Sequence, residues 1–276
     1  MPLGERKHRL TRTGLSLRGW APVLFVALLC SSGCAALLRA PTALEKGTVT
    51  GEEGYWKNNS LLESTRYRAL RIEVDWAPGC EPRTESLAAL LECARTWCDK
   101  PDGIELILHE ELPASALPEE GVTRELVRQL HRQHSNRQAA DGTTYYLHVL
   151  YLNRHAGRAT RGQVFFWADG TLSMNIFRRT IDSQAFLWLS AAKLERLVLV
   201  HEFGHVLGLV TNPRHRLRES DHCCNPTCIM YAKIDPRSVM ANFLPALFLG
   251  KVPRDFCDEC KADLRPAARA SGEEGG

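Results

Sequence analysis

The sequence has little net charge, no apolar run that could form a permanent transmembrane helix, and no apparent internal repeat. Its formal charge is +3 over 276 residues, and residues 1–33 contribute +4 of this, which leaves −1 on the rest. This balance excludes the basic surface expected of a protein that binds nucleic acid or a membrane surface. The apolar run at residues 21–30 is too short to span a bilayer, and the missing periodicity excludes a repeat architecture. The hydrophobic content of 44% is that of a globular protein of one or two domains.

The N-terminus has the organisation of an export signal. Basic residues between Arg6 and Arg18 precede the apolar run, and the small residues 31–33 follow it, directly before Cys34. The ending SSGC resembles the cleavage box of bacterial lipoproteins, which makes Cys34 the predicted lipidation site. Ordinary secretion with cleavage nearby is the alternative. We therefore expect a protein exported to the bacterial cell envelope (on the periplasmic or outer-membrane face), or secreted if it is not lipidated, with the lipid anchor as its only membrane contact.

The remainder divides into a linker, a folded domain and a tail. Residues 34–65 show little periodicity and are predicted to be a tether, with a pro-segment as the alternative. Residues 66–264 are predicted to form the domain, with an N-terminal subdomain at 66–208 and a C-terminal subdomain at 209–264. Residues 265–276 are predicted to be a disordered tail.

Hydrophobic periodicity predicts a mixed α/β fold, with a mixed sheet packed against helices. Residues 143–152 are apolar on both faces, which predicts a central strand, whereas residues 172–177 alternate and are predicted to lie near a sheet edge. Gly208 can adopt the left-handed conformation that ends the last long helix, and Thr84 is a candidate N-cap. The predicted strands are residues 66–76, 103–109, 143–152, 164–167 and 172–177, and the predicted helices are residues 84–97, 120–134 and 190–207.

The stretch HEFGH at residues 201–205 has the spacing of a zinc-protease motif. On a helix, His201 and His205 emerge one turn apart on the same face, where both can reach one Zn²⁺. Glu202 is then placed to deprotonate a metal-bound water. The alternative is that both histidines are core residues and Glu202 is a solvated charge.

The residues that follow the motif extend it into a longer pattern. After Gly208, a His-Cys pair is followed by four residues, a second cysteine, one residue and a methionine, and later by C-x2-C. This order resembles the archaemetzincins, a branch of the metzincin zinc peptidases, over roughly residues 201–260. The resemblance implies a metzincin-like α+β fold: a twisted mixed sheet, an active-site helix and a small C-terminal helical subdomain held by zinc. The matching residues are His222, Cys223, Cys228, Met230, Cys257 and Cys260.

The resemblance also implies a role for each matching residue. His201, His205 and His222 would bind a catalytic zinc, Glu202 would be the general base and then the proton donor to the leaving amine, and Met230 would form a tight turn under the metal. Four cysteines would hold a second zinc of the closed, structural kind, and two disulfides are the alternative for them. These cysteines are Cys223, Cys228, Cys257 and Cys260.

The sequence departs from the family pattern at one place. Thr211 stands where the pattern has the third histidine, and residues 209–221 form an insert. His222 is the predicted third ligand because the residues after it keep the family order, with His215 as the alternative and Asp221 as a third option. The insert is polar and basic, which predicts a solvated surface loop, and it could border the substrate cleft.

Four further cysteines, Cys80, Cys93, Cys98 and Cys224, allow two disulfides in three connectivities. Cys80 and Cys98 flank opposite ends of a helix about 20 Å long, so a bridge between them needs the chain to fold back. Cys224 could also replace Cys223 as a metal ligand.

These features predict an exported, zinc-dependent metallopeptidase that hydrolyses peptide bonds through a zinc-bound water, with Glu202 as general base. It would be a monomer with two Zn²⁺, would act on a peptide or protein substrate, and would not bind nucleic acid. The resemblance implies that the substrate runs along the sheet's edge strand, predicted at residues 172–177. The alternative is a catalytically inactive, zinc-stabilised binding or assembly lipoprotein, but Glu202 favours the enzyme. A zinc-ribbon nucleic-acid module fits poorly with export and with a charge near −1.

Overall fold

The computed structural model describes residues 57–135, 142–185, 189–217, 220–231, 253 and 255–265. The predicted export signal with Cys34, most of the predicted tether and residues 266–276 of the tail lie outside these ranges. Within them, no helix has both the length and the apolar composition needed to cross a membrane. The helices are α1 (Asn59–Leu62), α2 (Thr84–Trp97), η1 (Ala114–Ala116), α3 (Arg124–His134), α4 (Arg178–Ser183), α5 (Ala191–Leu207) and α7 (Asp258–Leu264), and the strands are β1 (Ala69–Trp76), β2 (Gly103–Glu111), β3 (Thr144–Leu152), β4 (Gly162–Phe166) and β5 (Leu172–Phe177).

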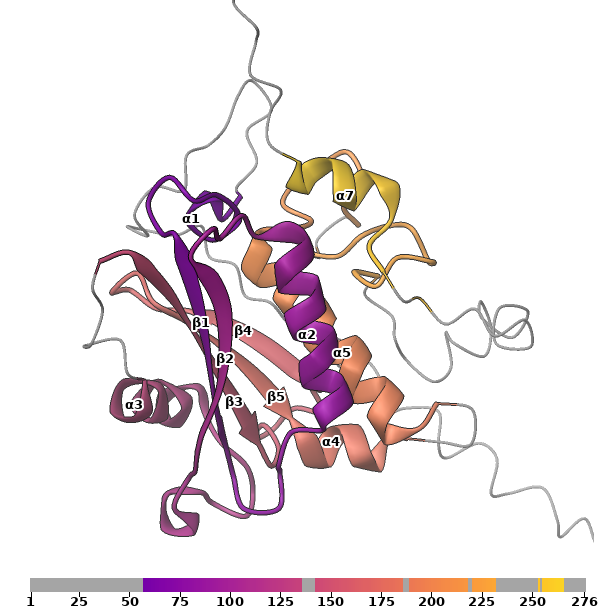
Figure 1. The fold of residues 1–276 in the computed structure, drawn as a ribbon. Helices are drawn as coiled ribbons and strands as arrows, with labels where there is room; N and C mark the ends of the chain where they lie inside the picture. The colour runs from indigo at the N-terminus through magenta and orange to yellow at the C-terminus, as the bar shows by residue number, and fades with distance from the viewer. Residues whose placement is uncertain are drawn as a thin grey trace, which may run out of the picture. The chain divides into compact units, whose positions relative to one another are not determined.

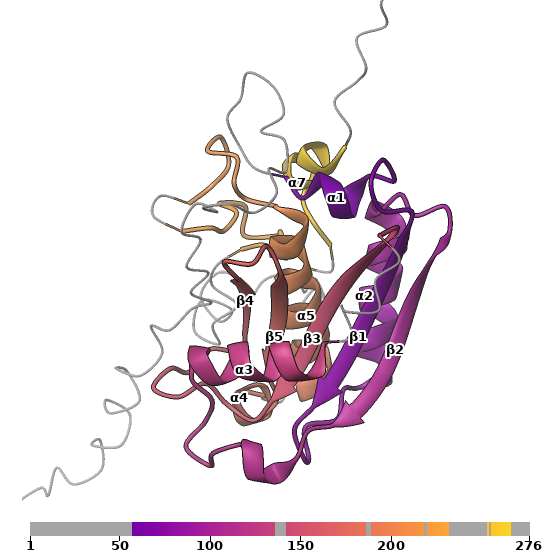
Figure 2. The ribbon, with the colours of Figure 1, turned by 90° about the vertical axis from the view of Figure 1, so that its left-hand side faces the viewer.

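The strands form one five-stranded sheet (Figure 1), in the order β2-β1-β3-β5-β4, which can be followed in Figure 2. The first four are parallel to one another, and β4 joins the end of the sheet antiparallel to β5. Parallel strands need a crossover between them, and α2 supplies the one between β1 and β2. The predicted mixed α/β class is confirmed, and β3 lies at the centre of the sheet as its two-sided apolar pattern predicted.

Helices cover both faces of this sheet. On one face α2 and α5 lie side by side, and α3 lies across the other (Figures 1 and 2). The first face packs Leu70, Ile72 and Val74 of β1 in the main core with α5, whereas β3 turns Leu150 and Leu152 toward α3 in a second core. Alternate residues of a strand point to opposite faces, so β3 supplies both cores, with Leu147, Val149 and Tyr151 in the main one, whereas β1 supplies the main core alone.

The predicted position of the edge strand is wrong. β5 pairs with β3 on one side and with β4 on the other, and all six of its residues are buried. Its polar residues suggested exposure, but the Asn175 side-chain amide donates to the carbonyl of Gln163 (3.0 Å) and to that of Ser173 (3.1 Å). The edge strand at this end of the sheet is therefore β4, and the polar alternation in β5 reflects hydrogen bonds inside the protein.

Two predicted boundaries also differ from the structure. The domain includes residues from about Lys57, because Leu61 and Leu62 of α1 are buried in the main core, so its predicted start at residue 66 is too late. Helix α3 begins after Thr123, whose hydroxyl accepts from the amide of Leu126, and not at residue 120. Helix α2 begins where predicted, but its N-cap is Arg83 and not Thr84.

Candidate functional site

Helix α5 carries the zinc-protease motif into the interior. Thirteen of its seventeen residues are buried, including His201, Glu202 and His205. A helix that is apolar on nearly all sides is stable only inside a protein. The Ser190 hydroxyl caps its start by accepting from the amide of Lys193, and Gly208, at φ 89°, ends it in the left-handed conformation predicted from the sequence.

The structure brings His222 to the two histidines of α5. The ring centroids of His201 and His205 lie 4.9 Å apart, and that of His222 lies 5.2 Å from each. One ring nitrogen of each lies within 4.8 Å of those of the other two. The Nδ1 of His201 lies 2.7 Å from the carbonyl oxygen of Ile229, so Nδ1 carries the proton and Nε2 is left as a ligand atom.

This histidine triad (His201, His205 and His222) is neutral near pH 7. Burial lowers the pKa of His201 to about 4 and that of His222 to about 3, and it lowers the pKa of His205 well below its ordinary value. Among the described residues, Nε2 of His201 and both ring nitrogens of His205 and His222 are buried without a hydrogen-bond partner. Buried polar atoms normally have partners. Three neutral imidazoles in this state are the donor set of an open zinc site.

Glu202 lies against the first residue of the edge strand. A Cβ atom built on Gly162 would lie 2.6 Å from Cγ and 2.7 Å from Oε1 of Glu202. Only glycine leaves room for this carboxylate, which is 1% exposed. The start of β4 therefore sets the position of the Glu202 side chain beside the triad.

Met230 packs against the helix turn between the two histidines of α5. A Cβ atom at Gly204 would lie 2.3 Å from Sδ of Met230 and 3.1 Å from the Phe256 ring. The Met230 carbonyl accepts a hydrogen bond from the amide of Cys223 (2.9 Å). Its side chain thus lies against the helix that carries His201 and His205, while its backbone holds the residue after His222.

The four cysteines of the C-x4-C and C-x2-C pairs form a second cluster, the cysteine cluster. Their Sγ atoms all lie within 4.8 Å of one another, and Cys223–Cys257 and Cys228–Cys260 are each 3.7 Å apart. Sulfurs around a tetrahedral zinc lie about 3.8 Å apart, given a Zn–S distance of about 2.3 Å. The separations of these two pairs therefore match a tetrahedral zinc site. Cys224 is exposed and lies outside it.

Hydrogen bonds favour the thiolate form of one member of the cysteine cluster, Cys228, whereas burial raises the pKa of Cys257 and hydrogen bonds with Cys223 and Cys228 raise that of Cys260. Bonds from the Cys223 and Cys260 thiols, together with the Cys257 amide at 3.2 Å, lower the pKa of Cys228 to about 5. The Asn225 amide lies 3.4 Å from the Cys223 sulfur. Backbone amides that point at sulfur stabilise negative charge there, as a metal-binding thiolate requires.

The structure does not place His215 with the triad. Its Nδ1 lies 3.7 Å from the Cys223 sulfur and 4.0 Å from the Cys260 sulfur, and its Nε2 lies 2.6 Å from Oδ2 of Asp263. Asp221, the third option, belongs to neither metal cluster and lies 3.7 Å from Arg216. Of the three candidates in the sequence, His222 alone is grouped with His201 and His205.

The insert is not the solvated loop that its composition predicted. Leu209, Val210, Asn212 and His215 are all buried. Arg214 and Arg216 are exposed and point outward, which contributes to the basic and polar character of the sequence, while these four side chains pack inside.

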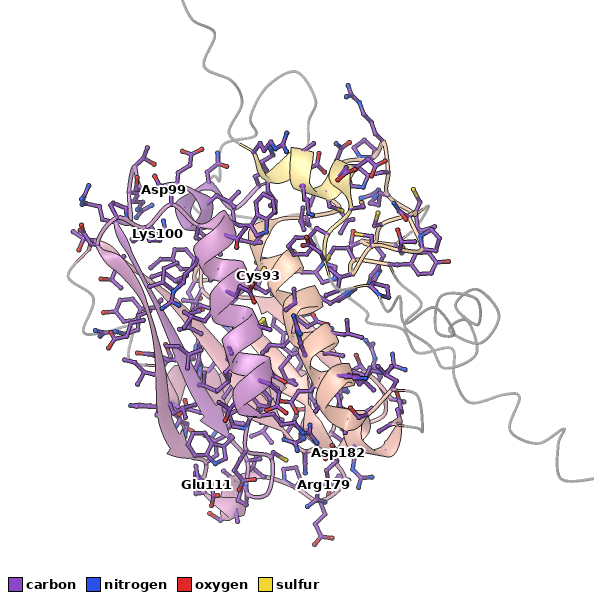
Figure 3. All side chains as sticks on the ribbon, turned by 45° about the vertical axis from the view of Figure 1, so that its right-hand side comes forward. Cys93, Asp99, Lys100, Glu111, Arg179 and Asp182 are labelled. Atoms are coloured by element: carbon purple, nitrogen blue, oxygen red, sulfur yellow. The ribbon has the colours of Figure 1, made fainter. Side chains whose placement is uncertain are left out.

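The disulfides that the sequence allowed are not formed in the described part of the chain, where all eight cysteines are free. Burial raises the pKa of Cys80 to about 11 and that of Cys98 to about 12, and burial likewise raises the pKa of Cys93. Cys93 lies on α2 where that helix runs beside α5 (Figure 3). These three thiols are core residues.

Four residues near the two clusters were not identified from the sequence: Gly162, Gly204, Asn212 and Asp263. A glycine inside a helix pattern, such as Gly204, signals close packing, so this one could have been found. The other three depend on contacts between distant segments, and no local pattern marks them.

No protein-family model matches this sequence, and no curated protein sequence matches it. The chain is similar in structure to crystalline archaemetzincin from Methanopyrus kandleri, with 14% identity over 74% of this chain and 97% of that one. The TM-score of 0.36 is too low to carry an argument. What the two clusters do must therefore be inferred from their own geometry and chemistry.

Proposed function

We propose that the protein is an exported zinc metallopeptidase that hydrolyses peptide bonds at the histidine triad. One observation carries the proposal: three buried, neutral imidazoles converge beside a buried glutamate, and their ligand nitrogens have no hydrogen-bond partner among the described residues. A zinc held by His201, His205 and His222 would polarise a carbonyl and lower the pKa of a water. A histidine set built only for packing would pair these nitrogens within the protein.

Glu202 would move the proton. Its carboxylate, held against Gly162, would accept a proton from the attacking water and pass it to the nitrogen of the leaving amine. A purely structural metal site has no use for such a base. Glu202 therefore favours catalysis over the alternative of an inactive, zinc-stabilised binding lipoprotein.

Strand β4 would bind the substrate. Among the described strands it pairs only with β5, so a peptide would add to its other edge as a further strand. Gly162, the first residue of β4, contacts Glu202. A peptide that pairs along β4 would consequently pass beside the base and the triad. This proposal replaces the assignment of the substrate strand to residues 172–177.

The cysteine cluster would hold a structural zinc. Four thiolates complete a tetrahedral site and leave no position for a substrate. The cluster joins two parts of the chain, with Cys223 and Cys228 from the segment after the insert and Cys257 and Cys260 from the segment around α7. Because His222 directly precedes Cys223, this zinc would also stabilise the segment that supplies the third ligand of the triad.

Export and lipidation rest on the sequence of residues 1–34 alone. Metabolic labelling with a fatty acid in a bacterial host, followed by membrane fractionation, tests them. Label should be lost in Cys34→Ala. Label retained in this variant would show that Cys34 is not the lipidated residue.

The Glu202→Gln variant tests the peptidase proposal. The zinc content should stay at two per chain, and hydrolysis of a fluorogenic peptide library should fall by about 10²–10⁴-fold, the usual contribution of a general base. Glu125→Gln, at an exposed position on α3, is the matched control and should keep full activity. Unchanged hydrolysis in Glu202→Gln would refute the role of Glu202. Hydrolysis by neither the wild type nor the control would favour the binding lipoprotein.

A further inference from the structure

The insert folds as a small hairpin against the segment that carries His222 and Cys223. Arg216 and Cys223 form an antiparallel bridge. The amide of Cys224 donates to the carbonyl of His215, and the amide of Leu217 donates to that of His222, both at 2.8 Å. One arm of the hairpin thus carries His215, and the other carries the adjacent residues His222 and Cys223, one from each metal cluster.

His215 is fixed on one side by two buried polar residues. Its Nε2 lies 2.6 Å from Oδ2 of Asp263, and Oδ1 of Asp263 accepts from the side-chain amide of Asn212 at 2.8 Å. Asn212 is 6% exposed, and His215 and Asp263 are each 7% exposed. A buried carboxylate with two such partners holds the imidazole in a single orientation. Asp263 belongs to α7, the helix that also carries Cys260.

The other nitrogen of His215 faces the cysteine cluster. Its Nδ1 lies 3.7 Å from the sulfur of Cys223 and 4.0 Å from that of Cys260, both within reach of a hydrogen bond to sulfur. Four thiolates around one Zn²⁺ carry a net charge of −2. An N–H that points at two of the sulfurs would stabilise this charge, as residues in contact with metal ligands commonly do.

We propose that His215 is a positioning residue of the cysteine-cluster metal site, where as an imidazolium it donates Nδ1–H to Cys223 and Cys260 and Nε2–H to Asp263, whose carboxylate is held in turn by Asn212. This inference rests on the proposed structural zinc. It assigns a use to the insert, which the resemblance does not explain. Because His222 lies on the same hairpin, loss of His215 weakens metal binding at the cysteine cluster first and at the triad second.

Three substitutions of His215 separate the contacts of its two nitrogens. The amide nitrogen of asparagine lies close to the position of Nδ1, so His215→Asn keeps a donor for the sulfurs. The amide of glutamine lies close to the position of Nε2, so His215→Gln keeps the contact with Asp263 and loses the sulfurs. His215→Ala loses both, and Arg214→Ala, at an exposed position in the same loop, is the control.

Cobalt(II) titration of the full chain detects metal binding at the cysteine cluster specifically, because charge-transfer absorption from thiolate to cobalt arises there and not at three histidines. Competition with zinc then gives the relative affinity. We expect His215→Ala and His215→Gln to bind the metal about 10–100-fold more weakly than the wild type. The affinity of His215→Asn should be intermediate, and that of Arg214→Ala should equal the wild-type affinity. Circular dichroism checks that each variant is folded.

The possible failures are distinguishable. Equal affinity in wild type, His215→Gln and His215→Ala would overturn the role of His215 and leave the structural zinc in place. Equal weakening in His215→Asn and His215→Gln would overturn the assignment of Nδ1 as the donor to sulfur. Absence of charge-transfer absorption in wild type would overturn the structural metal site and this inference together, while the Glu202→Gln experiment would still test the triad.

Discussion

Buried histidines occur on both sides of the central sheet, and their ring nitrogens differ in what they contact. On the α5 side, five of the six nitrogens of His201, His205 and His222 have no hydrogen-bond partner among the described residues. On the α3 side, His131 and His148 are buried as deeply. There, His148 Nε2 lies 2.7 Å from Asp75, the two Nδ1 atoms lie 2.9 Å apart, and His131 Nε2 lies 3.0 Å from Thr171.

The difference separates histidines that could bind a metal from histidines that support a core. The pair under α3 is satisfied by Asp75 and Thr171, and the Thr171 hydroxyl in turn lies 2.7 Å from Asp169. The triad has equal burial, but five of its six ring nitrogens have no such partner within the described part of the chain, which would leave it unfavourable without a ligand. Burial alone therefore does not identify a metal site. A candidate metal site is identified by buried ring nitrogens that have no hydrogen-bond partner.

The largest expected effect comes from removing one member of the triad. His222→Ala should lower the zinc content from two per chain to one and reduce peptide hydrolysis to background, because two imidazoles hold zinc too weakly. Metal analysis and a peptide assay measure both effects. His148→Ala is the matched variant from the other side of the sheet and should keep both zincs. A His222→Ala protein with two zincs would place His222 outside the metal site.

A smaller effect is expected where β4 meets Glu202. In Gly162→Ala, the new methyl group would lie within 3 Å of the Glu202 side chain and must displace it. A shift of about 1 Å in a catalytic group costs on the order of 10²-fold in rate, so kcat should fall by about this factor with two zincs retained. Full activity in this variant would show that the position of Glu202 does not depend on β4.

The pair under α3 should affect stability and not metal content. His148→Ala removes one partner of the fully buried Asp75, which keeps its contact with His109 at 3.3 Å, and should lower the free energy of unfolding by about 2–3 kcal/mol. Urea unfolding of the zinc-loaded protein measures this change. Loss of a zinc in His148→Ala would mean that the two groups of histidines do not differ as proposed.

The smallest effect is expected where Met230 packs against α5. Gly204→Ala brings a methyl group against the Met230 sulfur and should cost about 1–2 kcal/mol of stability, since the flexible methionine can move aside. In a double-mutant cycle with Met230→Ala, the two losses should be less than additive, because the smaller side chain removes the clash. Strict additivity would show that the two residues do not interact.

Local pattern predicted the helices and strands well where one period dominates. Helix α2, strand β5 and the end of α5 at Gly208 lie within one residue of the predicted bounds. Strand β5 shows the limit of this reasoning, because its alternating polar residues suggested an edge and are instead buried and hydrogen-bonded within the sheet. The pattern of polar and apolar residues shows the polarity of a strand, but it does not show which strands will pair with that strand.

The candidate site shows the same limit. HEFGH and the cysteine spacings identified the donors, because ligands at i and i+4 and in C-x2-C pairs are set by helix and turn geometry. From the sequence, His222 was preferred to His215 because the residues after it keep the order seen in the archaemetzincins, and geometry played no part in this choice. In the structure, the contacts of Asp263 and the cysteine cluster with His215 separate the two histidines.

By itself the sequence determined the chemistry available to this protein: three histidines, a glutamate and four thiols at ligand spacing, on a chain patterned for a mixed α/β sheet. Tertiary structure alone decided which histidine joins the triad, that β4 and not β5 is the edge strand, and that Gly162 and Asp263 support the two clusters. The physical reason is that spacing along the chain specifies neighbours only within a helix turn or a tight loop. Contacts over longer separations, from the 17 positions between His205 and His222 to the 48 between His215 and Asp263, depend on how the whole domain packs.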